Sequence, residues 1–168
     1  MHCLIVGTTR SGKTTLAKQL CKRYIAQGIN CLVNDPHGTV WPSGARMYAD
    51  INKLLAVAQK SQRCALFIEE AGQSVGRGRT ARELQWLTTG SAKYGHRTHL
   101  IAQTAQQIDP TVRTQCGQLF TFKQSRRNAE LLADDFAEPR IIEAMDLPQY
   151  HFLSVISCGD VKRYKLTL

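Results

Sequence analysis

Residues 7–14 read Gly7-Thr8-Thr9-Arg10-Ser11-Gly12-Lys13-Thr14, which matches the pattern G-x-x-x-x-G-K-[ST] at every fixed position. The two glycines allow backbone angles and close approaches that side chains forbid. An apolar run at His2–Val6 precedes the stretch, and apolar residues at helical spacing follow it from about Lys13. The sequence therefore predicts a strand, a phosphate-binding loop and a helix, in that order.

Loops of this kind bind the phosphates of ATP. Their backbone amides point inward at a helix N-terminus and form an anion-binding nest. We expect Lys13 to place its charge at the β- and γ-phosphates and the Thr14 hydroxyl to ligate Mg²⁺. The predicted ATP-binding residues are Gly7, Thr9, Arg10, Ser11, Gly12, Lys13, Thr14 and Thr15.

Strand-like apolar runs alternate with helical patterns along the chain. The expected strands are residues 2–6, 30–33, 64–68, 99–103 and 118–122, and the expected helices begin near Lys13, Asp50, Thr80, Ser125 and Pro139. Residues 34–49 are predicted to form a long loop, and 150–157 and 161–168 a C-terminal β-hairpin. This alternation predicts an α/β fold of the P-loop NTPase (RecA/ASCE-like) class in one domain, residues 1–168, with a mainly parallel central sheet flanked by helices.

The composition limits the classes of partner and compartment. The net charge of +9 over 168 residues indicates an anionic partner, usually nucleic acid, although a basic surface can also serve solubility alone. The apolar runs are too short to cross a bilayer, and Met1 leads straight into a strand, so we expect no signal peptide or transmembrane segment. The six cysteines are scattered without metal spacing, which favours reduced thiols.

A second acidic site is expected where the strand at residues 64–68 ends in Glu69 and Glu70. In P-loop motors such a strand end faces the γ-phosphate. We expect Glu69 to hold the Mg²⁺ shell and Glu70 to polarise the attacking water. Neighbouring side chains on a strand point to opposite faces, so the two acids need different roles unless the chain has already turned at Glu70. The alternative is a pair of solvated acids at a strand end.

Three further stretches resemble one superfamily. These are Asp35-Pro36-His37-Gly38, the lead-in and strand at residues 95–104, and residues 108–113. Together with the phosphate loop, they resemble the HerA/FtsK superfamily of DNA-translocating ATPases. Within it, the chain is most similar to the genome-packaging ATPases of membrane-containing icosahedral viruses and phages. It is also similar to the ATPase domain of the zonula-occludens-toxin-like proteins of filamentous phages.

The resemblance implies roles for three more side chains. Gln103 would sense the γ-phosphate from the end of its strand, which should lie between the strands that bear Gly7 and Glu69. Arg97 starts that strand at the edge away from its own nucleotide, so it suits an arginine finger acting on a neighbouring subunit. Arg113 is the second candidate for the finger. A finger acting in trans implies a homo-oligomeric ring, expected to be a hexamer.

Three arginines follow the acidic pair on a glycine-rich stretch: Arg77, Arg79 and Arg82. In a ring motor such a loop can line the channel and grip DNA phosphates without reading bases. A basic loop with no role in DNA binding is the alternative.

The resemblance implies an ATPase that moves double-stranded DNA through a ring during viral genome packaging, in the host cytoplasm or on the virion. It would dock on a capsid vertex or a membrane-associated viral protein. The alternatives are a filamentous-phage assembly ATPase, a small P-loop kinase with residues 77–82 as its lid, and a nucleotide switch without turnover.

Overall fold

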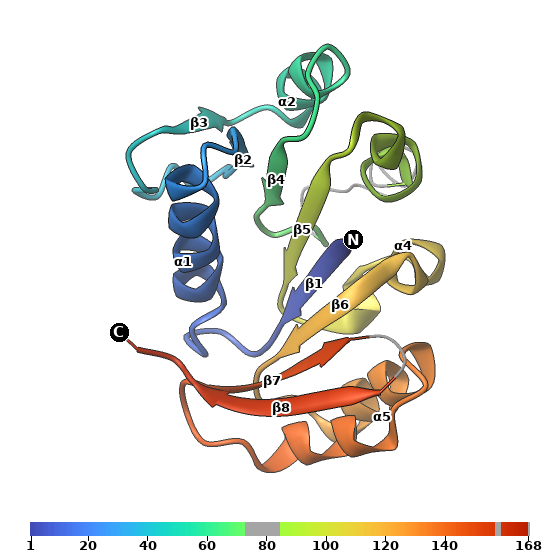
Figure 1. Ribbon diagram of the computed structural model, residues 1–168. Helices are drawn as coiled ribbons and strands as arrows, with labels where there is room; N and C mark the ends of the chain where they lie inside the picture. The colour runs from blue at the N-terminus through green and yellow to red at the C-terminus, as the bar shows by residue number, and fades with distance from the viewer. Residues whose placement is uncertain (73–84, 157–158, 168) are drawn as a thin grey trace.

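A single sheet organises the computed structural model, which describes residues 1–72, 85–156 and 159–167. Within these residues, eight strands run in the order β3-β2-β4-β5-β1-β6-β7-β8 (Figure 1). The strands are β1 (His2–Val6), β2 (Cys31–Asn34), β3 (Ala45–Tyr48), β4 (Ala65–Ile68), β5 (Arg97–Ala102), β6 (Cys116–Thr121), β7 (His151–Ile156) and β8 (Asp160–Lys165). The first six strands in this order, from β3 at the edge through β2, β4, β5 and β1 to β6, are parallel. β7 pairs antiparallel with both β6 and β8.

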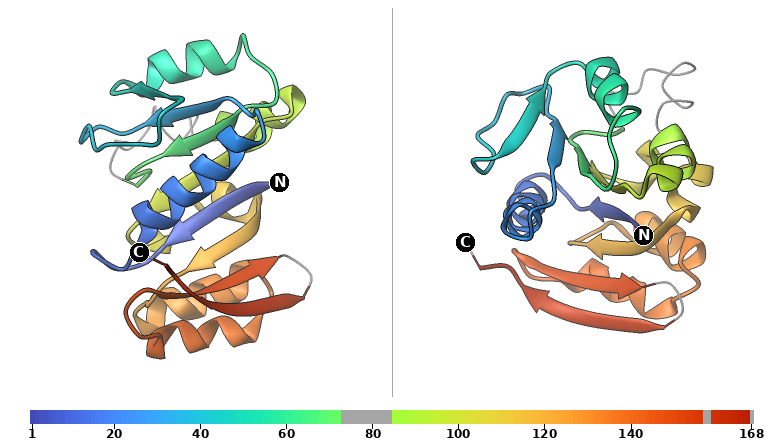
Figure 2. Two further views of the ribbon diagram at one scale, coloured as in Figure 1. Left: turned by 60° about the vertical axis from the view of Figure 1, so that its left-hand side comes forward. Right: turned by 45° about the horizontal axis from the view of Figure 1, so that its top comes forward.

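Helices cover both faces of this sheet (Figure 2). The helices are α1 (Lys13–Ala26), α2 (Ile51–Ala58), α4 (Pro110–Thr114) and α5 (Arg126–Asp135), with short helical segments η1 (Trp86–Gly90), η2 (Ser91–Tyr94), η3 (Ala105–Gln107) and η4 (Pro139–Asp146). Among the described residues, α1 lies on one face, and the other helices lie on the opposite face. This arrangement confirms the predicted α/β fold of the P-loop NTPase class.

The core follows the alternation of side chains along the central strands. On β1, Leu4 and Val6 face the cluster shared with α2 and α5, while Cys3 and Ile5 face the cluster shared with α1. β4 divides in the same way, with Phe67 on the α1 side. Strands covered on both faces read as continuous apolar runs, which explains why their positions were predictable.

Two segments differ from the predicted elements. β3 lies within the stretch predicted as a loop, and it pairs with β2 at the edge of the sheet. Its residues Arg46 and Met47 are exposed, so it lacks the apolar pattern that marks a buried strand. β5 begins at Arg97, two residues earlier than expected. The helix start predicted near Thr80 lies outside the described residues.

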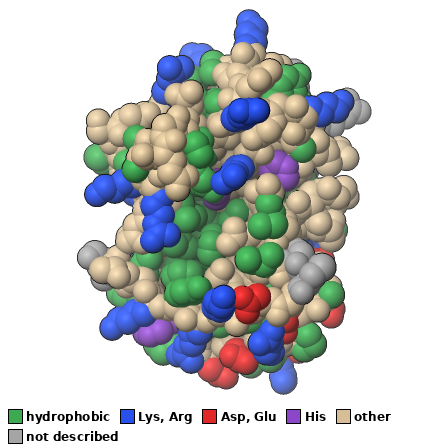
Figure 3. Space-filling model, viewed as in Figure 1, with side chains coloured by type: hydrophobic (Ala, Val, Ile, Leu, Met, Phe, Trp, Pro, Cys, Tyr) green, Lys and Arg blue, Asp and Glu red, His purple; other side chains and the backbone are tan. Residues whose placement is uncertain are grey.

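The C-terminal hairpin of β7 and β8 extends the sheet beyond the reach of α1. The face beside α1 is hollowed there, and apolar side chains line the hollow (Figure 3). The apolar lining includes Leu16, Leu20, Phe120, Phe152 and Leu166. In the described ranges, none of the helices has the length and apolar character needed to span a membrane.

Candidate nucleotide-binding site

The phosphate loop joins the end of β1 to the start of α1, and its two fixed glycines sit in crowded places. A Cβ on Gly7 would lie 2.6 Å from the Phe122 Cβ atom. Gly12 has a φ of 110°, and a Cβ there would lie 2.7 Å from the Leu166 side chain. Any larger residue at either position would displace its neighbours, so the loop path requires glycine at both.

Lys13 begins α1 and turns back over the loop. Its Nζ atom donates a hydrogen bond to the Thr8 carbonyl oxygen at 2.9 Å. Burial lowers the pKa of the Lys13 ammonium group, and the nearby Glu69 and Glu70 carboxylates oppose that shift. Within the described residues, the buried Ser11 hydroxyl has no hydrogen-bond partner. The loop therefore presents a cation and an unsatisfied hydroxyl, both suited to a phosphate.

The two acids follow β4, and the chain turns between them. The Glu69 amide still donates to the Asn34 carbonyl oxygen of β2 at 2.9 Å. Glu70 has a φ of 49°, in the left-handed region, and the next amide, of Ala71, donates to the Ile101 carbonyl oxygen of β5 at 2.8 Å. Because the backbone turns at Glu70, the rule that neighbouring side chains face opposite sides no longer applies.

Both carboxylates line one cavity of about 160 Å³ at the carboxyl ends of the central strands. Seven of its lining residues were predicted: Thr9, Arg10, Lys13, Thr14, Glu69, Glu70 and Gln103. Gly72, Ile101, Ala102 and Gln107 complete the lining. Two cations, two carboxylates and two amides converge here, as expected of a site that cleaves a phosphoanhydride.

The amide side chains come from the segment that follows β5. β5 lies between β4 and β1, as expected, and Gln103 directly follows its last residue, Ala102. Gln107, which was not predicted, ends η3, and its Oε1 atom accepts a hydrogen bond from the Thr104 amide at 3.2 Å. The Thr-x-x-Gln capping pattern of residues 104–107 is the sequence signal that marks this residue.

Thr14 and Glu69 provide oxygen ligands of the kind that Mg²⁺ prefers. Burial raises the pKa of the Glu69 carboxyl group, and a hydrogen bond with the Thr14 side chain opposes the rise. Mg²⁺ keeps several waters and takes few protein ligands beside substrate phosphates, so this pair fits it. In the part of the chain that the structure describes, no group of three or more His, Cys, Asp or Glu residues forms an alternative metal site.

The turn at residues 35–38, so far only a mark of resemblance, lies beside Glu70 of this cavity. The Asp35 carboxylate accepts hydrogen bonds from the His37 amide, the Thr39 amide and hydroxyl, and the Trp41 indole, at 2.6–3.0 Å. Burial alone would raise the pKa of Asp35, but these hydrogen bonds outweigh burial and lower it. The braced turn holds His37 within 3.7 Å of Glu70.

Arg97 lies at the far edge of the sheet from the cavity. It is exposed at the start of β5, and its guanidinium carbon lies 5.9 Å from the centre of the Tyr24 ring. It does not line the cavity. This position leaves the guanidinium accessible on the surface of the chain.

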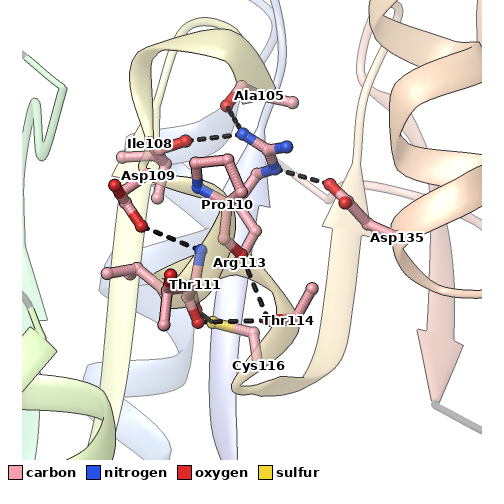
Figure 4. Close-up of polar contacts among 10 residues, drawn as sticks. Ala105, Ile108, Asp109, Pro110, Thr111, Arg113, Thr114, Cys116 and Asp135 are labelled. Carbon is pink, nitrogen blue, oxygen red and sulfur yellow. Dashed lines mark hydrogen bonds and ion pairs between the residues drawn. The ribbon is translucent and has the colours of Figure 1, made fainter.

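Arg113 is 4% exposed. Figure 4 shows its guanidinium held among Ala105, Ile108 and Asp135. Its Nε atom forms an ion pair with the Asp135 carboxylate, and its Nη1 atom donates to the carbonyl oxygens of Ala105 and Ile108 at 3.1 and 2.6 Å. These contacts join η3 and α4 to α5, which favours a structural role for Arg113. The role of Arg113 as the second candidate for the finger stays a prediction.

Thr15 lies on the outer side of the phosphate loop, where it lines a second cavity with Arg10, Gly12, Lys13 and Thr14. Arg77, Arg79 and Arg82, predicted to contact DNA, lie outside the described residues.

A phosphate loop with fixed glycines joins a strand to a helix and shares a cavity with two acids that follow β4, one strand beyond β5. This arrangement defines a P-loop NTPase. The family model described as "ATPase family associated with various cellular activities (AAA)" matches residues 3–124. The chain belongs to this family of ATPases. No curated protein sequence matches the chain.

Solved structures with the same fold include two complexes of one viral protein. The genome-packaging NTPase B204 of Sulfolobus turreted icosahedral virus 2 in complex with sulfate is 19% identical, with a TM-score of 0.83 over 99% of this chain and 96% of that one. Its complex with AMPPCP is 18% identical, with a TM-score of 0.82 over 99% and 98%. The N-terminal domain of zonular occludens toxin from Neisseria meningitidis is 16% identical, with a TM-score of 0.60 over 99% and 93%.

Proposed function

We propose that the chain is the ATPase subunit of a ring-shaped motor that translocates double-stranded DNA during viral genome packaging. The observation that carries the proposal is the cavity in which Lys13, both carboxylates and Gln103 meet. A kinase excludes water and transfers phosphate to a bound acceptor, whereas a carboxylate that activates water suits hydrolysis.

In the proposed reaction, a water oxygen attacks the γ-phosphorus of ATP while the bond to the β–γ bridging oxygen breaks, releasing ADP and phosphate. Glu70 accepts the proton of the attacking water, and Gln103 orients that water against the γ-phosphate. Lys13 and the loop amides stabilise the charge on the phosphate oxygens. Thr14 and Glu69 would hold Mg²⁺, whose positive charge neutralises the phosphate oxygens when it is bound.

In a ring, the arginine finger would come from a neighbouring subunit, because Arg97 does not line the cavity of its own subunit. Arg97 is exposed at the edge opposite the phosphate loop, so in a head-to-tail ring it would act at a neighbour's cavity. We propose a hexamer on this basis, docked on a capsid vertex or a membrane-associated viral protein in the host cytoplasm or on the virion.

Double-stranded DNA is the proposed anionic partner of the +9 chain. Arg77, Arg79 and Arg82 remain the proposed contacts to its phosphates. The likeness to a protein named as a genome-packaging NTPase supports this role. The second candidate is an assembly ATPase like zonular occludens toxin, whose domain has the lower TM-score.

The test measures ATP turnover with and without double-stranded DNA, together with ATP-driven displacement of a third strand from a DNA triplex. We expect DNA to stimulate turnover and the chain to displace the strand. Lys13→Ala should abolish both, whereas Lys22→Ala, an exposed lysine on the same helix, should retain both. Turnover without displacement would overturn the motor, and phosphate transfer to an acceptor in place of water would favour the kinase.

A further inference from the structure

A larger cavity lies on the side of the phosphate loop away from the two acids. Its volume is about 560 Å³, and a smaller cavity of about 320 Å³ lies beside it. Residues of the loop line both, as do Gln149 and Tyr150, which precede β7. Neither cavity includes Glu69, Glu70 or Gln103.

The sheet register explains why a segment near the end of the chain reaches the loop. Val6, the last residue of β1, pairs with Thr121 near the end of β6, and Thr121 pairs with Leu153 of β7. Because β7 runs antiparallel to β6, it starts where β1 and β6 end. The turn before β7 therefore lies at the same edge of the sheet as the phosphate loop (Figure 1).

The acidic cavity and the larger outer cavity together indicate how a nucleotide would lie across the phosphate loop. Arg10, Lys13 and Thr14 line both the acidic cavity and the outer one, so the phosphates span the boundary between them. Glu70 and Gln103, which the proposed function places at the γ-phosphate, line only the acidic cavity. The nucleoside must then extend to the outer side. We propose that Tyr150 and Gln149 form the nucleobase subsite, in which Tyr150 stacks on the base and Gln149 contacts its edge.

Tyr150 is held firmly in place for such a role. Its carbonyl oxygen accepts a hydrogen bond from the Leu166 amide at 2.7 Å, and its half-buried side chain packs against the cluster that contains Phe122 and Phe152. A Cβ on Gly12 would lie 3.4 Å from the Tyr150 Cδ1 atom, so the ring lies directly against the phosphate loop. Aromatic faces stack on any nucleobase, and a ring fixed beforehand loses little freedom on binding.

The backbone at Tyr150 also favours a functional reading. Its φ is 62°, in the left-handed region where glycine and asparagine are favoured and a bulky side chain is disfavoured. A tight turn alone would be met more easily by glycine. Residues held in such strained conformations cluster at ligand sites, where the surrounding structure keeps them.

Gln149 supplies the polar part of the subsite. It is exposed beside Tyr150, and its carboxamide carries both a donor and an acceptor, which can pair with a base edge. The His151 amide donates to the Pro148 carbonyl oxygen at 3.1 Å, which closes the turn that presents Gln149 and Tyr150. We therefore expect Tyr150 to set affinity for nucleotides and Gln149 to set preference among bases.

The experiment compares ATP with inorganic tripolyphosphate, which lacks the base, by isothermal titration calorimetry. Tyr150→Ala should weaken ATP binding about 10-fold, within the range for loss of one aromatic stack, and leave tripolyphosphate binding unchanged. Tyr150→Phe should bind ATP like the parent chain, as should Tyr164→Ala, which removes an exposed ring from the same hairpin. Gln149→Ala should reduce the ratio of ATP to GTP affinity.

Three outcomes would overturn the subsite. Equal losses for ATP and tripolyphosphate in Tyr150→Ala would mean that the ring only supports the phosphate loop. Unchanged ATP affinity in the same variant would place the base elsewhere. A parent chain that binds neither probe would overturn the nucleotide site itself, a result distinct from the first two. Tripolyphosphate binding by the variant also reports that its loop is folded.

Discussion

The His37 Nε2 atom lies 3.7 Å from the Glu70 Oε1 atom, although the two residues follow different strands of the sheet. His37 belongs to the turn after β2 that Asp35 braces, and Glu70 belongs to the turn after β4. The Glu70 side chain, which lines the cavity, is 25% exposed, and the His37 side chain beside it is 61% exposed. His37 is thus placed to position the carboxylate that we propose as the base.

Replacing His37 tests that positioning role. We expect His37→Ala to lower kcat for ATP about 3- to 10-fold with little change in KM, because the carboxylate loses a neighbour that orients it after substrate has bound. His37→Gln, which keeps a hydrogen-bond donor, should recover part of kcat. Steady-state kinetics at fixed DNA concentration makes the measurement. A change in KM alone would show that His37 contacts substrate.

Replacing Glu69 and Glu70 one at a time by glutamine should have different effects on ATP hydrolysis. Glu70→Gln should bind ATP at nearly the parent affinity and hydrolyse it at least about 100-fold more slowly, since proton acceptance is lost. Glu69→Gln should shift the Mg²⁺ concentration needed for half-maximal turnover upward, because an anionic ligand becomes neutral. Turnover at the parent rate in Glu70→Gln would place the base on another residue.

Arg97 should complete a neighbouring site. Arg97→Ala and Glu70→Gln subunits should each be nearly inactive alone, whereas a mixture should recover turnover at interfaces where an intact Glu70 meets an intact Arg97. A finger is worth about three to five powers of ten in rate, so recovery should stand well above background. ATP turnover of mixed rings with DNA present makes the measurement. Verified subunit exchange without recovery would exclude Arg97 as the finger.

Arg113 should behave as a structural residue. Arg113→Ala leaves the Asp135 carboxylate without its buried partner, so it should lower the free energy of unfolding by about 3 kcal/mol, measured by urea denaturation. Arg126→Ala breaks an exposed pair on the same helix as Asp135 and should cost less than about 1 kcal/mol. Loss of turnover in a fully stable Arg113→Ala ring would favour this residue as a finger.

Stability should fall in mild acid through His99. Burial lowers the pKa of His99 to about 4 from its ordinary 6.5, although backbone hydrogen bonds oppose the shift. Between these values the unfolded chain binds a proton that the folded chain does not, so stability is complete above about pH 6.5 and declines toward pH 4, by up to about 1.4 kcal/mol per pH unit. Urea denaturation at several pH values should show a smaller slope for His99→Gln. An identical slope would assign the effect to other groups.

The parts of the fold that a continuous apolar run or a glycine pattern marks could be predicted from the sequence. β1, β4 and the phosphate loop were found because burial on both faces and crowding at Gly7 and Gly12 constrain residue type. The edge strand β3 was missed, because its exposed side chains carry no such constraint. The residue pattern of a strand indicates the direction in which each side chain points and the period of the element. It does not show at which residue the following turn begins.

The candidate site could be predicted only in part for the same reason: a local pattern does not show where the chain turns. Sequence alone could not decide whether Glu69 and Glu70 share a cavity, because that depends on the backbone angle at one residue. The place of His37 depends on pairing between β2 and β4, and the burial of Arg113 depends on α5 lying beside α4. Each is a long-range relationship that no local spacing encodes.

The left-handed backbone conformation of Glu70 lowers the stability of the fold, although we propose that its side chain is needed for activity. A non-glycine residue in that region costs about 1–2 kcal/mol, a sizeable fraction of the net stability of a domain. Glycine would relieve the cost and leave the cavity without its second carboxylate. Under the proposed mechanism, a Glu70→Gly chain would therefore gain stability and lose turnover. In the mechanism that we propose, the strained backbone at Glu70 lets two acids adjacent in sequence act on one substrate.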